Sequence, residues 1–421
     1  MWEPTNDRFD PIDVLVESNR TRVQQLVPLR YARMAASPFS FLRGSALVMA
    51  YDLAMGPRTP LEVRLCGDAH LANFGIFASP ERRLVFDLND FDEAAPGPFD
   101  WDVKRLAASI MVAARDAGRD SVAARRAVLE AVAAYRDWTE RYAGMTHLDV
   151  WYARIEATDL MDSMRATEER RMRRSLSRVA AKNHLTALAK LTREIDGRRQ
   201  IIDDPPVVMH VNDEVPELQF GLMALFSQYR ETLSADRRAL FDRYRFVDFA
   251  RKVVGVGSVG TRCWVAVFQG PNGGPLFLQV KEARPSAPGL ALDQVLNMHH
   301  GQRVVEGQRM LQATSDVMLG WGTDPTTGIH YFVRQLWDSK GSIDVTGLTP
   351  AGFNLYANYC GWALARAHAR TGDSVAVCGY IGASERFGEA IADWATAYAD
   401  QTQRDHAALL AAIERGALST V

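Results

Sequence analysis

The chain has 421 residues, of which 47% are hydrophobic and 24% are charged, and its formal net charge at pH 7 is -2. This length and apolar content predict a globular protein with two or more hydrophobic cores. The balanced charge argues against a nucleic-acid-binding protein, because such proteins carry a basic surface. No apolar run reaches transmembrane length, residues 1–11 lack the pattern of a signal peptide, and the four cysteines have no metal-like spacing. We therefore expect a cytoplasmic protein with reduced thiols and without a membrane partner.

The first part of the chain is predicted to be helical. Residues 12–36 have a helical pattern, and the segment SPFSFLRG (37–44) leads into another helix. Arg43 precedes that second helix, where it could contact a phosphate or an acidic substrate. Pairing with a carboxylate of its own domain is the more common role for such an arginine, and both interpretations stay open here.

A loop rich in polar residues follows the strand-like alternation of residues 61–65. This loop reads GDAHLAN (67–73) and places Asp68 five residues before Asn73. A second strand-like run at 84–86 follows it. The pattern is a carboxylate and an amide in one loop, then a strand.

The second acidic loop, NDFDE (89–93), carries Asp90 and Asp92 directly after the strand. Phosphoryl transfer requires this combination of loops. One Asp orients the attacking hydroxyl, while an Asn and another Asp hold Mg²⁺ against the nucleotide phosphates.

Both loops resemble motifs of the aminoglycoside and choline kinase-like phosphotransferases. GDAHLAN is similar to their catalytic loop H-G-D-x-H-x-x-N, with Cys66 where the family often has His. The second loop resembles their metal loop I-D-[WF]-[ED], and Gly97 and Asp102 follow Asp90 in the register of the family's G…D-L-A segment. By this resemblance, Asp102 would brace the catalytic loop from behind.

The resemblance also implies a role for each side chain of the two loops. Asp68 would orient or accept the proton of a substrate hydroxyl, and His70 would support the loop by hydrogen bonding. Asn73 and Asp90 would bind magnesium that bridges the phosphates. Asp92 would assist a second magnesium ion or cap the helix that follows.

The next hundred residues are predicted to be mostly helical. Residues 102–145 form two helices separated at Gly118, and residues 150–200 continue as charged helix. The run EERRMRRSLSRVAAK (168–182) is interpreted as a solvated helix face, with binding of an anionic partner as the alternative. The segment 201–208 interrupts the helices, and another helix is expected at about 216–244.

Residues 251–283 change character and read as three consecutive strands. Their glycines form a G-x-G-x-x-G pattern that leads into a strand, as in the glycine-rich hairpin over kinase phosphates, whereas a Rossmann loop opens a helix. Without Cβ atoms, the loop backbone can approach phosphate closely. The predicted phosphate-binding positions are Gly255, Gly257, Ser258 and Gly260.

Lys281, near the end of the third strand, occupies the place of the kinase strand lysine. It would hold the α and β phosphates of ATP. Residues 290–313 are expected to be helical, with Glu306 predicted to pair with Lys281 and keep it extended. Asp293 is the other candidate partner.

Two strands around the turn TDPTTG follow that helix. The end of the second strand would be the hinge whose backbone receives adenine, which assigns Gln335, Leu336 and Trp337 to the nucleotide site. The amphipathic helix at 352–370 resembles the helix that leads into the catalytic loop of ordinary kinases. Further helices are expected at about 384–416.

The order of these parts predicts a circularly permuted kinase-like fold. In ordinary kinases the glycine loop, lysine and helix glutamate come first, whereas here the catalytic and metal loops (67–93) precede them. We expect an α+β protein with a small antiparallel lobe and a large helical lobe, in which residues 352–370 lie beside the segment before Gly67 and Lys281 lies near Asp90. The predicted boundaries are 1–245 for the helical lobe, 246–340 for the nucleotide-binding lobe and 341–421 for the return to the helical lobe.

The whole chain, from residues 37–44 to 398–406, also resembles the bacterial family catalogued as domain of unknown function 2252. The predicted activity is an ATP- and Mg²⁺-dependent phosphotransferase acting on a hydroxyl of an unknown small-molecule or protein acceptor. Three alternatives stay open: an AMP transferase, a non-catalytic nucleotide-binding protein, and a metal-dependent hydrolase. The hydrolase would use as ligands Asp68, His70, Asp87, Asp90 and Asp92.

Overall fold

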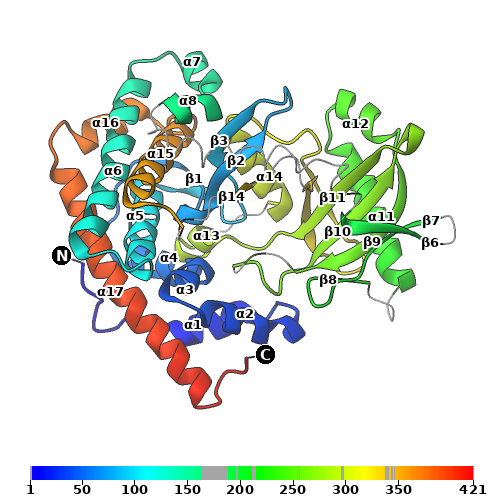
Figure 1. The fold of residues 1–421 in the computed structure, drawn as a ribbon, viewed down its shortest axis with the longest axis horizontal. Coiled ribbons are helices and arrows are strands. Elements are labelled where there is room, and N and C mark those ends of the chain that lie inside the picture. Colours follow the sequence, from blue (N-terminus) through cyan, green and yellow to red (C-terminus); the bar gives the residue numbers. More distant parts are fainter. Residues whose placement is uncertain are drawn as a thin grey trace.

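The computed structural model describes residues 2–162, 188, 190–195, 198–210, 215–253, 255, 257–294, 298–336, 341–342, 345 and 347–420. These residues form a mixed α/β protein with several antiparallel sheets. Helices gather on one side of the molecule and a six-stranded sheet on the other, with the blue N-terminal helices below them in Figure 1. In the described part of the chain, no helix is both long enough and apolar enough to cross a membrane.

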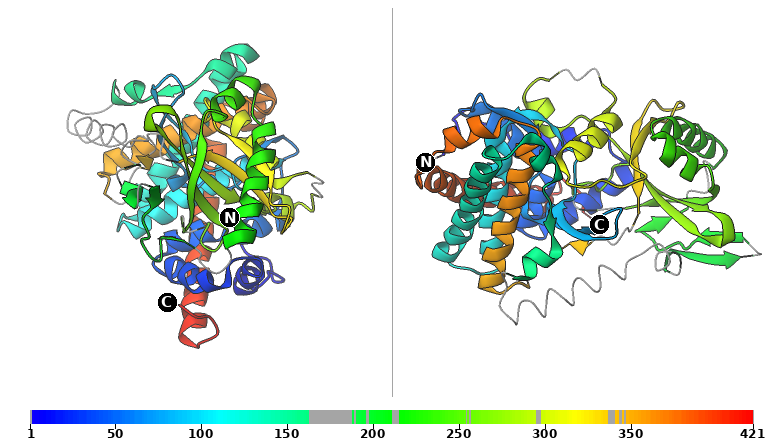
Figure 2. Two further views of the ribbon diagram at one scale, coloured as in Figure 1. Left: turned by 90° about the vertical axis from the view of Figure 1, so that its right-hand side faces the viewer. Right: turned by 90° about the horizontal axis from the view of Figure 1, so that it is seen from above.

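Long helices form the first core. α5 (Phe99–Asp116) packs against α6 (Ser121–Ala143) and α17 (Arg386–Glu414), and α15 (Pro350–Ala369) packs along α6. Figure 2 shows α6 and α15 side by side in the view from above, with the green strands at the opposite end. Small residues on the facing surfaces let these helices approach closely, and a Cβ at Gly361 would lie 2.0 Å from the carbonyl oxygen of Ala131.

Short capped helices make up the N-terminal region. The carboxylate of Asp10 accepts a hydrogen bond from the N–H of Ile12, and the hydroxyl of Ser37 accepts one from Ser40. A proline follows each cap, and the fixed φ of proline suits the first turn of a helix. The elements are α1 (Pro11–Asn19), η1 (Gln24–Leu26), α2 (Val27–Ala35), α3 (Pro38–Gly44) and α4 (Ala46–Met55).

The largest sheet is antiparallel and has the strand order β12-β13-β11-β10-β9-β8. Alternate residues of its strands point to opposite faces. Trp264, Ala266 and Phe268 pack on one face against α11 (Val215–Glu231). Helix α12 (Ala235–Phe241) follows α11. The strands are β8 (Val208–Met209), β9 (Arg245–Lys252), β10 (Cys263–Gln269), β11 (Pro275–Glu282), β12 (Gly320–Thr323) and β13 (His330–Gln335), and η3 (Pro271–Gly273) joins β10 to β11.

Two smaller sheets hold the acidic loops. β1 pairs with β4, and a second sheet has the order β14-β2-β3-β5, so each loop is held between strands at both of its ends. Short helices close the gaps around them. These elements are β1 (Glu62–Leu65), η2 (Leu71–Asn73), β2 (Phe74–Ala78), β3 (Leu84–Leu88), β4 (Ala95–Pro98), α7 (His147–Tyr152), β5 (Ile155–Glu156), α8 (Ala157–Asp162), β14 (Gly341–Ser342) and α16 (Ser374–Ile381).

Most predicted elements are confirmed, with the following differences. Residues 192–201 form a hairpin of β6 (Thr192–Ile195) and β7 (Arg198–Ile201), not a helix. The predicted helix at 290–313 is divided into α13 (Ala287–Ala291) and α14 (His300–Leu311), because Asp293 has a φ of 50° that a helix cannot accommodate. Strands β2, β4, β5, β8 and β14 were not predicted, and the predicted helix at 216–244 is divided into α11 and α12. The charged run at 168–182 lies outside the described residues.

The expected proximity of residues 352–370 and the segment before Gly67 is confirmed. The N–H of Arg64, in β1, donates to Oγ1 of Thr371 just after α15, at 3.2 Å. A Cβ at Gly372 would lie 2.6 Å from Val63. The C-terminal end of α15 therefore lies against the strand that enters the first acidic loop.

Candidate functional site

The first acidic loop is braced by the N-terminal turn of α5. Asp102 accepts hydrogen bonds from the backbone N–H groups of Cys66, at 2.6 Å, and Gly67, at 3.0 Å. Nε2 of His368 lies 3.3 Å from Oδ2 of Asp102, and the hydroxyl of Tyr135 lies 2.8 Å from the other ring nitrogen of that histidine. The predicted bracing role of Asp102 is confirmed. The loop is thus fixed by a buried polar chain that runs through the helical core.

The two acidic loops touch each other. Gly67 has a φ of 80°, and a Cβ there would lie 2.0 Å from the carbonyl oxygen of Glu93. Only glycine fits both the conformation and the close approach. The N–H of Asn89 also donates to the carbonyl oxygen of Asn73 at 2.8 Å. The loops therefore form one unit in which their side chains have a defined separation.

Asp68 is held by an ion pair that the motif does not predict. Nε of Arg105 donates to Oδ1 of Asp68 at 2.8 Å, and the same guanidinium donates to the carbonyl oxygen of Leu42 at 2.7 Å. Burial raises the pKa of Asp68, whereas Arg105 acts in the opposite direction. Arg105 lies three residues after Asp102 on the same helix face. That i, i+3 spacing is the signal from which it could have been found.

His70 supports the loop, as predicted. Its Nδ1 accepts a hydrogen bond from the N–H of Ala72 at 3.2 Å, and its Nε2 lies 3.7 Å from Oδ2 of Asp68. Burial lowers the pKa of His70 well below its ordinary value, so the ring is neutral. Since Nδ1 accepts, the proton is on Nε2, facing the carboxylate.

Two of the predicted metal residues, Asp90 and Asp92, lie beside Lys281, and the third, Asn73, lines the first cavity with them. The ammonium group of Lys281 pairs with Oδ2 of Asp92 and lies 4.0 Å from Oδ1 of Asp90. Nδ2 of Asn73 donates to the carbonyl oxygen of Asp68 at 2.7 Å, which fixes the orientation of the amide. Burial and the neighbouring Asp90 raise the pKa of Asp92 to about 6. Burial opposes the charge of Lys281, but Asp90 and Asp92 outweigh it and raise the lysine pKa.

These residues suit magnesium that also binds phosphate. Oδ1 of Asp92 is buried and accepts no hydrogen bond from the described residues, so it can serve as a ligand. Magnesium takes one or two carboxylates from the protein and fills its octahedron with water and phosphate oxygens. The described residues contain no group of three or more His, Cys, Asp or Glu side chains that could hold a metal by themselves.

The predicted pairing of Lys281 with Glu306 is wrong. The carboxylate of Glu306 accepts a hydrogen bond from Gln302 at 2.7 Å, one turn away on the same helix. Among the described residues, the ion pairs of Lys281 are those with Asp90 and Asp92. Gln308 is the α14 side chain that shares a cavity with Lys281. Two residues along a helix correspond to a rotation of about 200°, so Glu306 lies on the opposite side of α14.

The glycine loop joins β9 to β10 as an antiparallel hairpin, as predicted. Gly255 and Gly260 have φ values of 47° and 86°. The N-terminal region fastens this loop. The N–H of Val23 donates to the carbonyl oxygen of Gly260 at 2.8 Å, and guanidinium groups of Arg22 and Arg33 donate to the carbonyl oxygens of Val259, at 2.6 Å, and Gly255, at 2.8 Å.

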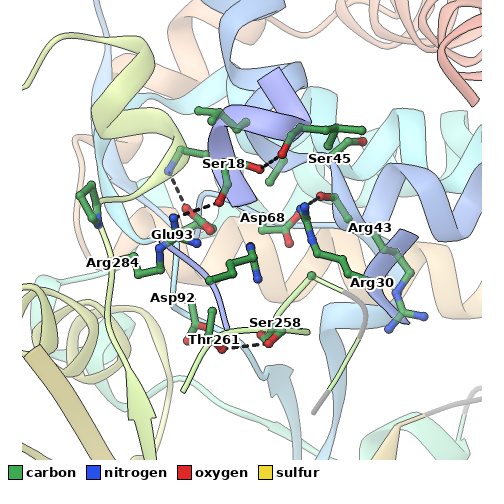
Figure 3. Close-up of a pocket in the computed structure, with 18 of the residues that line it drawn as sticks. Ser18, Arg30, Arg43, Ser45, Asp68, Asp92, Glu93, Ser258, Thr261 and Arg284 are labelled. Carbon is green, nitrogen blue, oxygen red and sulfur yellow. Dashed lines mark hydrogen bonds between the residues drawn. The ribbon is translucent and has the colours of Figure 1, made fainter. Parts of the chain in front are cut away.

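Two cavities meet at the glycine loop. One has a volume of 390 Å³ and is lined by both acidic loops and the N-terminal helices (Figure 3). The other has a volume of 320 Å³ and lies between the large sheet and α14. Three lining residues are common to both, namely Asp90, Gly255 and Ser258. Gly257, Asp68, His70, Asn73 and Asp92 line the first, and Lys281, Gln335 and Leu336 line the second; Gly260 and Glu306 line neither.

A model of the DUF2252 family, described as uncharacterized proteins conserved in bacteria, matches residues 22–412. The chain belongs to this family. No curated protein and no solved structure matches the chain. The match spans both acidic loops, the glycine loop and the lining of the second cavity, whereas the first cavity is also lined by residues between 14 and 21, which precede the match.

In this DUF2252 protein the predicted hinge is only partly available to a base. The N–H of Gln335 donates to the carboxylate of Asp316, and the N–H of Leu336 donates to the carbonyl oxygen of Phe277 at 2.9 Å. These two donors are therefore already used. The third predicted hinge residue, Trp337, lies outside the described residues. Polar side chains that the sequence did not indicate line the same cavity, including Gln279, Gln308, Gln312 and Arg334.

Proposed function

We propose that this protein is an ATP- and Mg²⁺-dependent phosphotransferase with a kinase-like, circularly permuted fold, acting on a hydroxyl group of its acceptor. The observation that carries the proposal is the ion pair of Lys281 with Asp92, in which the ammonium group also lies 4.0 Å from Oδ1 of Asp90. This ion pair joins the strand lysine that follows the glycine loop to the acidic loop beside Asp68. A lysine, a glycine hairpin and paired carboxylates around one space are the parts that phosphoryl transfer requires.

The permuted connection has support in the contact between Thr371 and Arg64. In an ordinary kinase order, the helix equivalent to α15 leads directly into the catalytic loop. Here that helix ends against β1, the strand before the loop, although the two are far apart in sequence. The chain would therefore have the kinase arrangement in space with different termini.

The two cavities suggest how substrates would be arranged. ATP would lie in the cavity of Lys281, with its phosphates directed to Asp90, Gly255 and Ser258, where the cavities meet. The acceptor would enter the cavity of Asp68. Its hydroxyl oxygen would attack the γ-phosphorus, a new P–O bond would form, and the bond to the bridging oxygen would break to release ADP.

The side chains divide the remaining tasks. Asp68, oriented by Arg105 and by the neutral His70, would position the hydroxyl and receive its proton. Lys281 would hold the α and β phosphates. Asn73, Asp90 and Asp92 would bind magnesium, which neutralises the charge of the phosphate oxygens.

The hydrolase alternative has less support, because one of its five ligands is committed elsewhere. Asp87 is 0% exposed. One terminal nitrogen of Arg366 donates to both of its carboxylate oxygens, at 2.7 and 2.8 Å. A carboxylate in this pair would have to leave a buried cation unpaired to bind a metal.

Calorimetric titration of ATP with and without Mg²⁺ tests the proposal. Wild type should bind ATP more tightly with Mg²⁺, and Asp90→Ala should remove most of that gain. Asp137→Ala, on the exposed side of α6, is the matched control and should behave as wild type. Failure of the wild-type protein to bind ATP in either condition would refute the nucleotide site.

A further inference from the structure

Five arginines line the cavity that contains Asp68; Arg20 pairs with Glu17, and the other four form a group. Arg22, Arg30 and Arg43 come from the N-terminal helices and the segment between them, and Arg284 follows β11. Figure 3 shows Arg30, Arg43 and Arg284 around the space that holds Asp68. The motifs of phosphoryl transfer account for none of these four side chains. We refer to them as the arginine wall.

No member of the arginine wall has a carboxylate within 4.0 Å among the described residues. Arg30 is 2% exposed, and one of its terminal nitrogens donates to the carbonyl oxygen of Gly44 at 2.7 Å. Arg284 donates to Oγ1 of Thr21 at 2.5 Å. These partners are neutral, so they satisfy donors without neutralising charge.

Three N–H donors of the arginine wall are buried and have no hydrogen-bond acceptor among the described residues. They are the Nε groups of Arg22, Arg30 and Arg43. Burial lowers the pKa of Arg22 well below its ordinary value, and the neighbouring charges of Arg30 and Arg284 lower it further. Buried cations that repel one another and keep unused donors are costly unless an anion joins them.

The carboxylates of the same cavity do not supply that anion. All but one have a cation of their own within 4.0 Å that is not part of the wall. The exception is Glu93, whose Oε2 accepts a hydrogen bond from the N–H of Ala287 at 2.5 Å. The pairs are Asp68 with Arg105, Asp90 and Asp92 with Lys281, Glu282 with Arg262, and Glu17 with Arg20.

We propose that the arginine wall binds a phosphate monoester, so that the acceptor is a small hydroxyl compound that already carries a phosphate group. The assignment of this ligand as the acceptor rests on the proposed function; the anion site itself does not. A phosphate dianion offers three oxygens to guanidinium groups that converge from several directions, whereas a planar carboxylate suits one or two. A volume of 390 Å³ suits a small molecule.

The test is calorimetry with inorganic phosphate, glycerol 3-phosphate, glycerate and glycerol as separate probes. Wild type should bind the two phosphates, bind glycerate more weakly and not bind glycerol. Arg43→Gln and Arg284→Gln should each weaken phosphate binding roughly tenfold to a hundredfold, the usual effect of losing one charge-assisted contact. Arg58→Gln, which removes the same charge at an exposed residue outside the cavity, should have no effect.

Lys281→Met separates this inference from the proposed function. It should weaken ATP binding and leave phosphate binding unchanged. Arg43→Gln and Arg284→Gln should weaken phosphate binding and leave ATP binding unchanged. Phosphate binding that depends on Arg43 and Arg284 in a protein that does not bind ATP would support the anion site and reject the kinase. The inference is overturned by any of three results. The wild-type protein binds no phosphate, or phosphate binding is weakened by Lys281→Met but by neither arginine variant, or glycerate binds as tightly as glycerol 3-phosphate.

Discussion

Lys281 and Asp92 form an ion pair that connects the large sheet to the second acidic loop. Lys281 is 2% exposed and also lies 5.8 Å from the ring centroid of Phe332. The aromatic ring adds a cation–π contact to the ion pair. The ammonium group compensates two carboxylates that would otherwise repel each other in a confined space.

Replacement of Lys281 should be more damaging than replacement of Glu306. Lys281→Met leaves Asp90 and Asp92 without their cation and removes the contact to phosphate, so we expect ATP affinity to fall roughly tenfold to a hundredfold. Glu306→Gln keeps the contact with Gln302 and should leave affinity within about twofold, near the limit for a neutral surface change. Calorimetric titration of both variants with Mg-ATP measures this. Equal losses of ATP affinity in the two variants would instead support the pairing of Lys281 with Glu306.

Asp68→Asn should abolish transfer and leave nucleotide binding almost unchanged. The amide cannot accept the proton, and it no longer neutralises Arg105, whose side chain is 3% exposed. We expect the free energy of unfolding to fall by about 2 kcal/mol. Product formation, ATP titration and urea unfolding together test the prediction. Turnover at the wild-type rate would remove Asp68 from the catalytic role.

Asp102 carries a stability prediction that does not depend on an acceptor. Asp102→Asn leaves only one oxygen for the N–H groups of Cys66 and Gly67, and turns an amide toward the other donor. A buried donor without an acceptor costs about 1–3 kcal/mol, so urea unfolding should show a loss in this range. Asp120→Asn is the control, because Asn caps a helix as well as Asp does and Asp120 caps α6.

His210 should make the segment beside β9 more stable at low pH. Its ring nitrogens lie 2.9 Å from Asp203 and 3.1 Å from Asp248. Burial opposes the charged ring, but the two carboxylates outweigh it and raise the pKa of His210. A raised pKa means that the stabilisation is complete below the unfolded value of about 6.5 and is lost as the pH rises through the folded value.

Hydrogen exchange of residues 198–210 measures this effect. At pH 6, His210→Gln should exchange faster than wild type, and the difference should shrink by pH 8.5. Comparing the two proteins at the same pH removes the intrinsic pH dependence of exchange. A difference that is constant over this range would show that the histidine acts through its neutral ring.

The sequence identified the groups that belong to a known motif, including Lys281 and Asp102, which reach the loops from a strand and a helix, and it missed Arg105, which belongs to none. Motif spacing grouped Asp68, Asn73 and Asp90, which line one cavity because each belongs to a short loop between strands. The ion pair of Arg105 with Asp68 joins a helix to a loop many residues away, and local pattern contains no information on it. The i, i+3 relation to Asp102 becomes informative only after the bracing role is known.

The error over Glu306 has a physical origin. The predicted helix was continuous from 290 to 313, so a residue at its middle seemed to face the strand lysine. The break at Asp293 and the start of α14 at His300 set the rotation of the helix. A side chain two positions away then faces the cavity. Helix existence was predictable from periodicity, but rotation about its axis was decided by packing.

The fastening of the glycine loop by residues 22–33 bears on how the protein can be shortened. A chain that begins at residue 57 would contain both acidic loops, the glycine loop and Lys281, and would still lack residues 22–33, which bind the carbonyl oxygens of Gly255 and Gly260. Deletion experiments guided by motifs alone would thus attribute the resulting loss of function to the wrong part of the chain. The N-terminal region is also tied to the far end of the chain, since Arg8 bridges Asp52 and Asp405, and Tyr31 and Leu409 belong to one hydrophobic core. An affinity tag inserted within α1 or the last turns of α17 would therefore disturb the glycine loop.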